Sequence, residues 1–471
     1  MLPVEDNSHA RGPVIGFAHK GDYQMTEPTA AGTPDQDVRV KDSAAPLSAS
    51  GGNRLLSLDF TRGIAVMGIL AANIVAFGQP MMAYMWPDGF MVPHGETSDW
   101  LWFAQFVLID GKMRGLFTLL FGAGMLLFLD KAWERGQGRG LQFRRLLWLL
   151  AFGLIHFFFI WKGDILTLYA ICGVIALLFV KWKPGTQMGV GVVFFYVGAA
   201  IYSAMSGFLF YAMKMGGVEA MAEAGAASGE GPSAAELREN FGAMKTQQIE
   251  ASAIETPLIQ SGDYFGWVQY NLTEHWAEPL SGFLIFGFET IPLMLIGMAL
   301  YRWGLFDGRI NAKKQAIWGA IGVLVGILGS IFIGLWTLEQ DLNFYATFLS
   351  IWGTSSFFQL PYVIGLAALL ALIGPRATGW LGSRVSAAGR MAFSNYLGTS
   401  ILMLLVFHGF ALGLFGELSR PQLYLVVVVT WLIMLAWSKA WLSRYRFGPL
   451  EWLWRCLTYG KRYPIRREHN A

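Results

Sequence analysis

The residues of this chain that could perform chemistry are ionisable or imidazole side chains set in apolar stretches. His156 lies near the end of the stretch 144–161, and Asp164 follows it after a short turn at 161–163. A turn this short holds two antiparallel helices together, so we expect His156 to face Asp164. A carboxylate that fixes the tautomer of an imidazole makes it a general base. The alternative is a His–Asp pair that only caps a helical hairpin.

Three further charged residues interrupt apolar stretches. Lys112 and Arg114 open the stretch 113–130, where they would stabilise a developing oxyanion or bind an anionic substrate. Interfacial anchors that extend to lipid headgroups would look the same. Glu289 lies near the middle of 280–301, and a carboxylate in such a stretch is costly unless it is paired or protonated. We therefore expect Glu289 to line a cavity.

The remaining candidates are uncharged or weakly basic. Asn73, Asn395 and His408 lie inside apolar stretches, and we assign them to substrate binding, with helix packing as the alternative. The two cysteines, Cys172 and Cys456, stand in different environments, so they predict neither a disulfide nor a thiolate metal site. We expect no bound metal. No Walker loop, dinucleotide fingerprint, HExxH or GxSxG motif occurs.

The elements that must position these residues are membrane-spanning helices. The chain is 54% hydrophobic and only 14% charged, against roughly 25% charged in soluble domains. Apolar runs long enough to cross about 30 Å of hydrocarbon recur along it. The sequence therefore predicts an all-α, polytopic transmembrane bundle of about ten helices. The expected spans are 60–79, 113–130, 144–161, 164–181, 187–212, 280–301, 315–336, 347–373, 391–415 and 421–443.

Charge predicts the orientation of the bundle. Lys and Arg concentrate in the loops 131–145, 302–314 and 376–390 and in the tail after 443, whereas the opposite loops carry mostly acids. The positive-inside rule then places both ends of the chain in the cytoplasm. The functional candidates share the outer half of the membrane or lie just below it: Asn73, Arg114, His156, Asp164, His408 and Glu289.

The chain divides into five parts by composition. The tail 1–52 lacks any apolar run and is expected to be disordered, and no removable signal peptide opens it. The connection 213–279 is acidic with helical segments on the outer face, or a loosely ordered loop. The other parts are a membrane half at 53–212, with five spans and an interfacial helix at 99–110, a second half of five spans at 280–443, and a basic tail at 444–471.

Several segments resemble a known family. They are RLLSLDFTRGIAVMGILAANIVAFGQP (54–80), DGKMRGLFTLLFGAGMLLF (110–128), RRLLWLLAFGLIHFFFIWKGDILTLYAICG (144–173), GRMAFSNYLGTSILMLLVFHG (389–409) and FGPLEWLWRCLTYGK (447–461). In order and spacing they are similar to the YeiB-like membrane proteins, the domain of unknown function numbered 418. That family is in turn similar to the transmembrane acyltransferases that include heparan-alpha-glucosaminide N-acetyltransferase.

The resemblance implies an acyltransferase of the inner or plasma membrane. It implies acyl-CoA as a cytoplasmic donor substrate, no bound cofactor, and a glycan or lipid-linked acceptor at the outer side. His156 would be the base, Asp164 its orienting partner and Arg114 an electrostatic stabiliser. The arginines of the loop 135–145 would suit the phosphates of acyl-CoA, although the positive-inside rule already explains them.

Two other functions fit the composition. In a transporter of a small metabolite or lipid-linked compound, the same polar residues could coordinate solute or protons. The other hypothesis is a non-catalytic membrane scaffold. In each case the partner is the lipid bilayer and no nucleic acid is expected. The composition is also compatible with a homo-oligomer.

Overall fold

The computed structural model describes residues 56–93, 95–227 and 231–467. The tail predicted at 1–52 lies outside them. Within these ranges the regular structure is helical, and the extended backbone amounts to one isolated bridge between Tyr445 and Arg466. The chain is thus a helical membrane protein, as the composition predicts.

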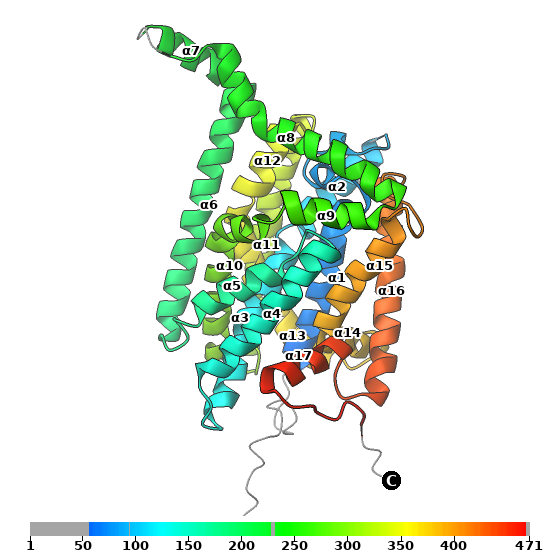
Figure 1. Cartoon of the computed structure of the whole chain (residues 1–471). Coiled ribbons are helices and arrows are strands. Elements are labelled where there is room, and N and C mark those ends of the chain that lie inside the picture. Colours follow the sequence, from blue (N-terminus) through cyan, green and yellow to red (C-terminus); the bar gives the residue numbers. More distant parts are fainter. Residues whose placement is uncertain (1–55, 94, 228–230, 468–471) are drawn as a thin grey trace, which may run out of the picture. The chain divides into compact units, whose positions relative to one another are not determined.

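In the first half of the bundle the second helix continues into the third, and the other successive helices reverse direction, starting from the end at which the described chain begins (Figure 1). Its helices are α1 (Leu56–Gly78), α2 (Glu96–Leu108), α3 (Lys112–Trp133), α4 (Arg139–Phe159), α5 (Leu166–Ala176) and α6 (Pro184–Lys214). Between α1 and α2 the chain makes two short 3-10 turns, at Met81–Tyr84 and Pro87–Gly89.

Three helices follow at the opposite end of the bundle: α7 (Gly217–Ala227), which projects away from the bundle beyond α6 (Figure 1), α8 (Ala234–Ser261) and α9 (Tyr264–Glu274). α8 begins with a capping box between Ser233 and Glu236 and ends at Gly262, whose φ of 77° suits glycine. In Figure 1, α8 and α9 lie across the top of α4 and α15. We call this end the capped end.

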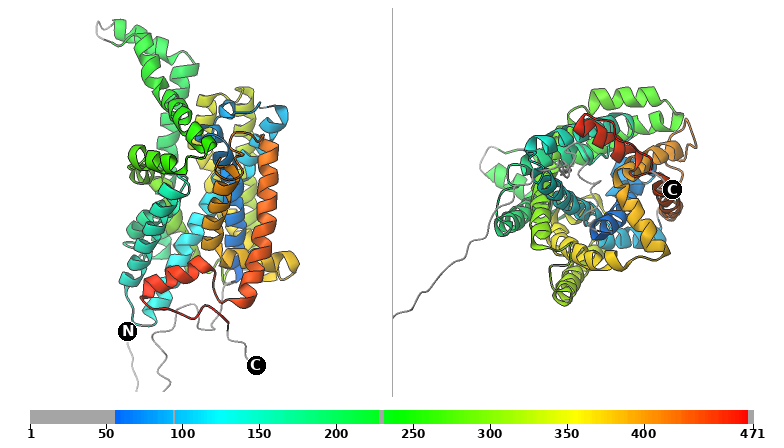
Figure 2. Two further views of the ribbon diagram at one scale, coloured as in Figure 1. Left: turned by 45° about the vertical axis from the view of Figure 1, so that its right-hand side comes forward. Right: turned by 90° about the horizontal axis from the view of Figure 1, so that it is seen from below.

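The second half begins with α10 (Glu278–Trp303) and α11 (Ala312–Glu339). It continues through α12 (Phe344–Phe348), a π-helical segment (Leu349–Thr354), α13 (Ser356–Ile373), α14 (Trp380–Arg390), α15 (Ala392–Phe407) and α16 (Arg420–Arg444), and it ends in the short helix α17 (Pro449–Tyr459). Figure 2 shows α17 at the end opposite α8 and α9. Because the Lys/Arg-rich loops predict this side to be cytoplasmic, we call it the basic end.

Eight helices of the described residues are long and apolar enough to cross a membrane, or nine if a bent pair counts as one span. The sequence predicts about ten. The segment predicted to be a span at 164–181 holds only the 11-residue helix α5. The segment 99–110, predicted as interfacial, belongs to α2, which joins α3 in one candidate span of 38 residues.

Close helix packing holds the bundle together where glycines face a neighbouring backbone. A Cβ on Gly122 of α3 would lie 2.2 Å from the Met294 carbonyl oxygen of α10, and one on Gly297 would lie 2.0 Å from the Leu119 oxygen. Small residues at such crossings let two backbones approach within the membrane. α3 and α10 therefore form a rigid central pair, and both carry candidate site residues.

Candidate functional site

The turn between α4 and α5 fixes the position of His156 and Asp164. α4 ends when the amides of Ile160 and Trp161 both donate to the His156 carbonyl, at 3.0 and 2.8 Å. Asp164 then starts α5, because its Oδ2 accepts the amide of Thr167 at 2.7 Å. The backbone thus aims both side chains at the space between the two helices.

His156 and Asp164 meet as the sequence predicts. The imidazole Nδ1 lies 2.8 Å from Asp164 Oδ1, and both side chains are fully buried. An ionised carboxylate only accepts hydrogen bonds, so with Asp164 in that state Nδ1 carries the proton and donates it to Asp164. Nε2 then keeps its lone pair. It is buried and has no hydrogen-bond partner among the described residues, which is the state a general base requires.

A cavity of about 170 Å³ opens beside this pair, and we call it the inner cavity. Tyr169 and Tyr396 are among its lining residues. The Tyr396 ring lies 5.2 Å from the His156 ring, and its hydroxyl accepts the amide of Ile165 at 3.2 Å. The inner cavity therefore ends one side chain away from the imidazole.

The other wall of the inner cavity is cationic. Arg62, Arg145 and Arg390 line it, together with Glu451 of α17. The Arg145 guanidinium stacks 4.1 Å from the Trp454 ring, which fixes its direction. Arg62 is also paired with Asp59, 3.8 Å away, so three arginines face two carboxylates, and the remaining positive charge favours an anionic ligand at the basic end.

The inner cavity also contains a hydrogen-bond acceptor, on Gln142, that has no partner among the described residues. Gln142 is 1% exposed and lines the inner cavity, and its Oε1 has no hydrogen-bond partner among the described residues. Buried amide oxygens are nearly always paired with protein or with ordered water. A hydrated or ligand-filled cavity satisfies this atom.

Glu451 attaches α17 to the start of α15. Its carboxylate accepts the amides of Phe393 and Ser394 at 2.8 and 3.0 Å and the Ser394 hydroxyl at 2.5 Å. These are the donors that the first turn of a helix leaves unpaired. Burial raises the pKa of Glu451 above its ordinary value, although the hydrogen bonds from Ser394 and Phe393 oppose that shift.

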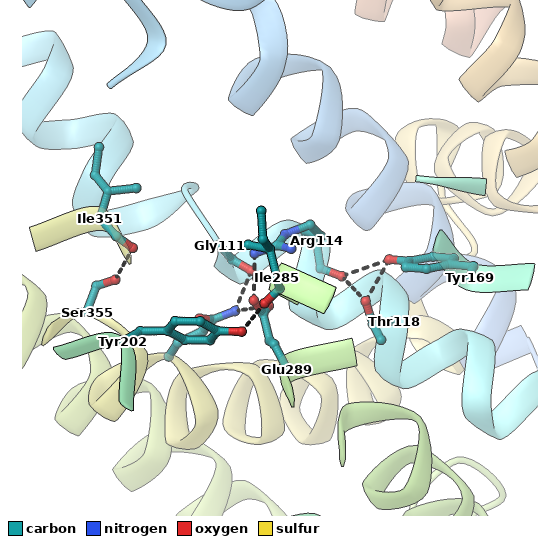
Figure 3. Close-up of polar contacts among 10 residues, drawn as sticks. Gly111, Arg114, Thr118, Tyr169, Tyr202, Ile285, Glu289, Ile351 and Ser355 are labelled. Atoms are coloured by element: carbon teal, nitrogen blue, oxygen red, sulfur yellow. Dashed lines mark hydrogen bonds and ion pairs between the residues drawn. The ribbon is translucent and has the colours of Figure 1, made fainter. Parts of the chain in front are cut away.

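A second polar cluster surrounds Glu289. Arg114 Nη2 lies 2.6 Å from Glu289 Oε2, and Gln359 Nε2 donates to Glu289 Oε1 and to the Gly111 carbonyl, each at 2.8 Å. Figure 3 shows Arg114 directed at Glu289, beside Gly111 and Ile285. The carboxylate is therefore paired, which removes the cost of a lone charge at this depth.

The backbone carbonyl of Arg114 connects this cluster to Tyr169, which lines the inner cavity. Thr118 and Tyr169 both donate to the Arg114 oxygen, at 2.9 and 3.3 Å, and their hydroxyls lie 2.6 Å apart (Figure 3). Arg114 thus fixes the phenol that lines the inner cavity. Its own guanidinium lies over the Phe286 ring, 4.6 Å from the centroid.

Lys112 lies at the break between α2 and α3 and is 1% exposed. Its Nζ donates to the Phe106 carbonyl at 2.5 Å. This geometry excludes an anchor that reaches the lipid headgroups. Gln105 holds the same break by donating to Asp110 at 2.9 Å, and it accepts from the buried Arg420 at 3.0 Å.

The last three candidates lie apart from the His156–Asp164 pair. Asn395 joins helices: its Nδ2 donates to the Ala388 carbonyl and to Ser438, each at 3.0 Å. His408 caps α15, is 6% exposed and lines a separate cavity at the capped end. Asn73 is partly exposed on α1 and lines neither described cavity.

Sequence reasoning missed the residues that shape the inner cavity. Tyr169, Tyr396 and Glu451 carry no local signal, because a tyrosine in a span and a glutamate in a basic tail are both common. Arg145 and Arg390 lie in two of the Lys/Arg-rich loops, which served mainly to predict the orientation. The bend of 86° between α14 and α15 brings Tyr396 and Arg390 to the cavity, and no periodicity predicts it.

Comparisons with known proteins agree with this architecture. Residues 300–461 match the model of a protein of unknown function, DUF418. The chain is 30% identical to the uncharacterised protein YeiB of Escherichia coli over 417 residues, which cover 86% of this chain and 96% of that protein. It is also 30% identical to the uncharacterised protein YxaH of Bacillus subtilis over 426 residues, covering 88% and 96%. No solved structure matches the chain. The chain belongs to the YeiB-like, DUF418-containing family of multi-pass membrane proteins.

Proposed function

We propose that this protein is an acyltransferase of the bacterial plasma membrane that takes its acyl group from a cytoplasmic acyl-CoA. The observation that carries the proposal is the inner cavity. It has arginines at the basic end and ends beside His156, whose Nε2 is buried and unpaired among the described residues. An anionic donor that reaches an activated base is the arrangement that acyl transfer from a thioester needs.

The donor would bind with its phosphates at the arginines. Guanidinium groups bind phosphate through paired, charge-assisted hydrogen bonds. Arg145 and Arg62 lie on different helices, and both face the inner cavity. A cavity of about 170 Å³ has room for the thioester and a short acyl chain, while the nucleotide stays at the basic end.

His156 would perform the proton transfer. Nε2 takes the proton of the acceptor hydroxyl or amine while that oxygen or nitrogen attacks the thioester carbonyl. The bond to sulfur then breaks, and the proton returns through Nε2 to the leaving thiolate. Asp164 holds the tautomer and stabilises the imidazolium that forms. The Tyr396 hydroxyl, which accepts the Ile165 amide and lines the inner cavity, would donate to the developing oxyanion.

Arg114 would act as a positioning residue in this proposal. Its guanidinium is paired with Glu289, whereas its carbonyl accepts from Tyr169 at the cavity wall. A substitution at Arg114 keeps that carbonyl, so it is expected to act through loss of the ion pair with Glu289.

The test is acylation of envelope lipids and glycans, measured by mass spectrometry in a deletion strain that carries each variant. Wild type should restore the missing acylated species, and His156→Ala should not. His275→Ala is the matched control, because His275 pairs with Glu278 at the capped end. Restoration by His156→Ala would overturn the proposal.

One observation favours a transporter as the second candidate. The bundle has helix breaks at 109–111, at the π-helical segment Leu349–Thr354 and at the bend between α14 and α15. Broken helices near the middle of the membrane are typical of secondary transporters. Uptake of an unmodified solute into proteoliposomes, unaffected by His156→Ala, would favour this function.

A further inference from the structure

A second cavity of about 30 Å³ lies at the capped end, beneath α8 and α9, and we call it the outer chamber. It is lined by the ends of α1 and α15, by the turn after α4, and by residues of the two covering helices. At this size the chamber has room for about two waters. A larger ligand can enter only if α8 and α9 move.

The outer chamber has the chemistry of a binding site. Trp161, Trp267 and Phe77 line it, and Trp161 stacks on Phe77 with 4.0 Å between the ring centroids. His408 is 6% exposed, lines the chamber, and has a buried Nδ1 without a partner among the described residues. An aromatic lining with an unused polar atom matches a ligand that has an apolar face and a polar edge.

The charges of the outer chamber cancel. Lys162 and Glu255 form an ion pair, and the Trp267 indole donates to the same carboxylate at 3.3 Å. A charged ligand would leave one member of this pair buried without compensation, at high cost. A neutral ligand with hydroxyl groups meets no such penalty.

Trp161 separates the outer chamber from His156. It lines the chamber, and its ring lies 6.3 Å from the imidazole in an edge-on contact. The indole can occupy this position because residue 163 is a glycine: a Cβ on Gly163 would lie 2.2 Å from the Trp161 ring. Trp161 belongs to the non-helical turn after α4, and its side chain is buried between the outer chamber and His156.

We propose that the outer chamber binds a neutral, polyhydroxylated molecule, admitted when the Lys162–Glu255 ion pair opens and placed next to His156 when Trp161 turns aside. The pair joins α8 to the turn after α4, so it acts as a latch on the covering helices. This inference rests on the proposed function for the role of the ligand as acyl acceptor. Binding itself does not depend on catalysis.

Access to the outer chamber is measured with a reporter thiol. Both native cysteines, Cys172 and Cys456, are first replaced by alanine. Met403→Cys then places a thiol in the chamber wall, where the methionine is fully buried. A membrane-impermeant maleimide is added from the outer side. Glu255→Gln should speed labelling about tenfold, as expected for the loss of one charge-assisted hydrogen bond. Glu250→Gln on the same helix should not.

Ligand class is measured by protection of the same thiol. Methyl glucoside should slow labelling of Met403→Cys several-fold, whereas glucose 6-phosphate should not. Vesicles that contain a glucosyl diacylglycerol, compared with plain diacylglycerol, distinguish a lipid headgroup from a free sugar. Met91→Cys, at a position 46% exposed, is the reference thiol and should respond to no probe.

The outcomes are separable from those of the proposed function. Labelling unchanged by Glu255→Gln, absence of protection by every sugar, or equal protection by the phosphorylated sugar would each overturn this inference. Protection together with an absence of acyl-CoA consumption would leave the outer chamber standing as a binding site and overturn the acyltransferase.

Discussion

His156 and Asp164 illustrate how a short turn determines the chemistry available to a buried pair. The carboxylate accepts both the imidazole proton and the Thr167 amide in the first turn of α5, so one side chain orients the base and starts the next helix. The pair therefore has a structural role and a chemical one. Substitution at Asp164 alone cannot separate them, whereas the proposed test at His156 leaves the start of α5 in place.

Glu289 offers a test of the second polar cluster at the same scale. Glu289→Ala removes the ion pair of Arg114, whose side chain is only 27% exposed. We expect a loss of about 1–3 kcal/mol in the free energy of unfolding, because a buried charged donor loses its acceptor. Glu289→Gln keeps an acceptor for Arg114 and should lose less. Thermal unfolding in lipid nanodiscs measures both, and equal stability of the two variants would contradict this view of the pair.

At the scale of elements, the contact of α3 with α10 sets the positions of Arg114 and Glu289. Gly122→Ala places a methyl group against the Met294 carbonyl, so we expect destabilisation of about 1–3 kcal/mol, as for other overpacked contacts. Gly282→Ala is the matched control on α10, because no atom lies within 4 Å of the added methyl. Thermal unfolding of both variants measures the difference. A lower unfolding temperature for Gly282→Ala than for Gly122→Ala would refute close packing at this crossing.

The attachment of α17 should depend on pH. Burial raises the pKa of Glu451, so the folded protein holds this proton more tightly than an exposed glutamate does. The resulting stabilisation is complete below the ordinary pKa of glutamate and is lost as the pH rises through the raised value. Limited proteolysis of the C-terminal segment should therefore slow as the pH falls. Glu451→Gln should show no such slope, and an identical slope in that variant would exclude Glu451 as the cause.

Sequence patterns predict some of these elements and miss others for physical reasons. Long apolar runs predict α1, α10, α11 and α16 well, because a span needs length and hydropathy alone. Length and hydropathy also predicted one span at 164–181, where α5 ends at Ala176 and short turns follow. Residues 177–180 of these turns are as apolar as the helix, so hydropathy does not show where the helical hydrogen bonds end. The break at 109–111 is held by Gln105 of α2, which donates to Asp110, and by the distant Gln359 of α13, which donates to the Gly111 carbonyl.

At the scale of the whole bundle, the sequence predicted one shared depth for the candidates, and the structure separates them into groups. His156 and Asp164 form one pair, Arg114 and Glu289 a second, and His408 lies with the outer chamber. Depth follows from position along a span. Which face of a helix meets which neighbour depends on tertiary packing, so the inner cavity could not be predicted.

The two cavities lie on either side of the His156 region. The inner cavity reaches it through Tyr396, and the outer chamber reaches it through Trp161. A donor held at the basic end and an acceptor held at the capped end would meet at one base without either crossing the membrane. The proposed function depends on this arrangement more than on any single residue.

The most direct test supplies acyl-CoA, which does not cross bilayers, to sealed vesicles of each orientation and measures release of the CoA thiol. Release should occur only where the basic end faces the donor. Arg145→Gln should raise the donor concentration that gives half the maximal rate by roughly tenfold, as expected for one lost charge-assisted contact. His156→Ala should stop release while donor binding persists. Equal release from either side, or full release by His156→Ala, would contradict the account.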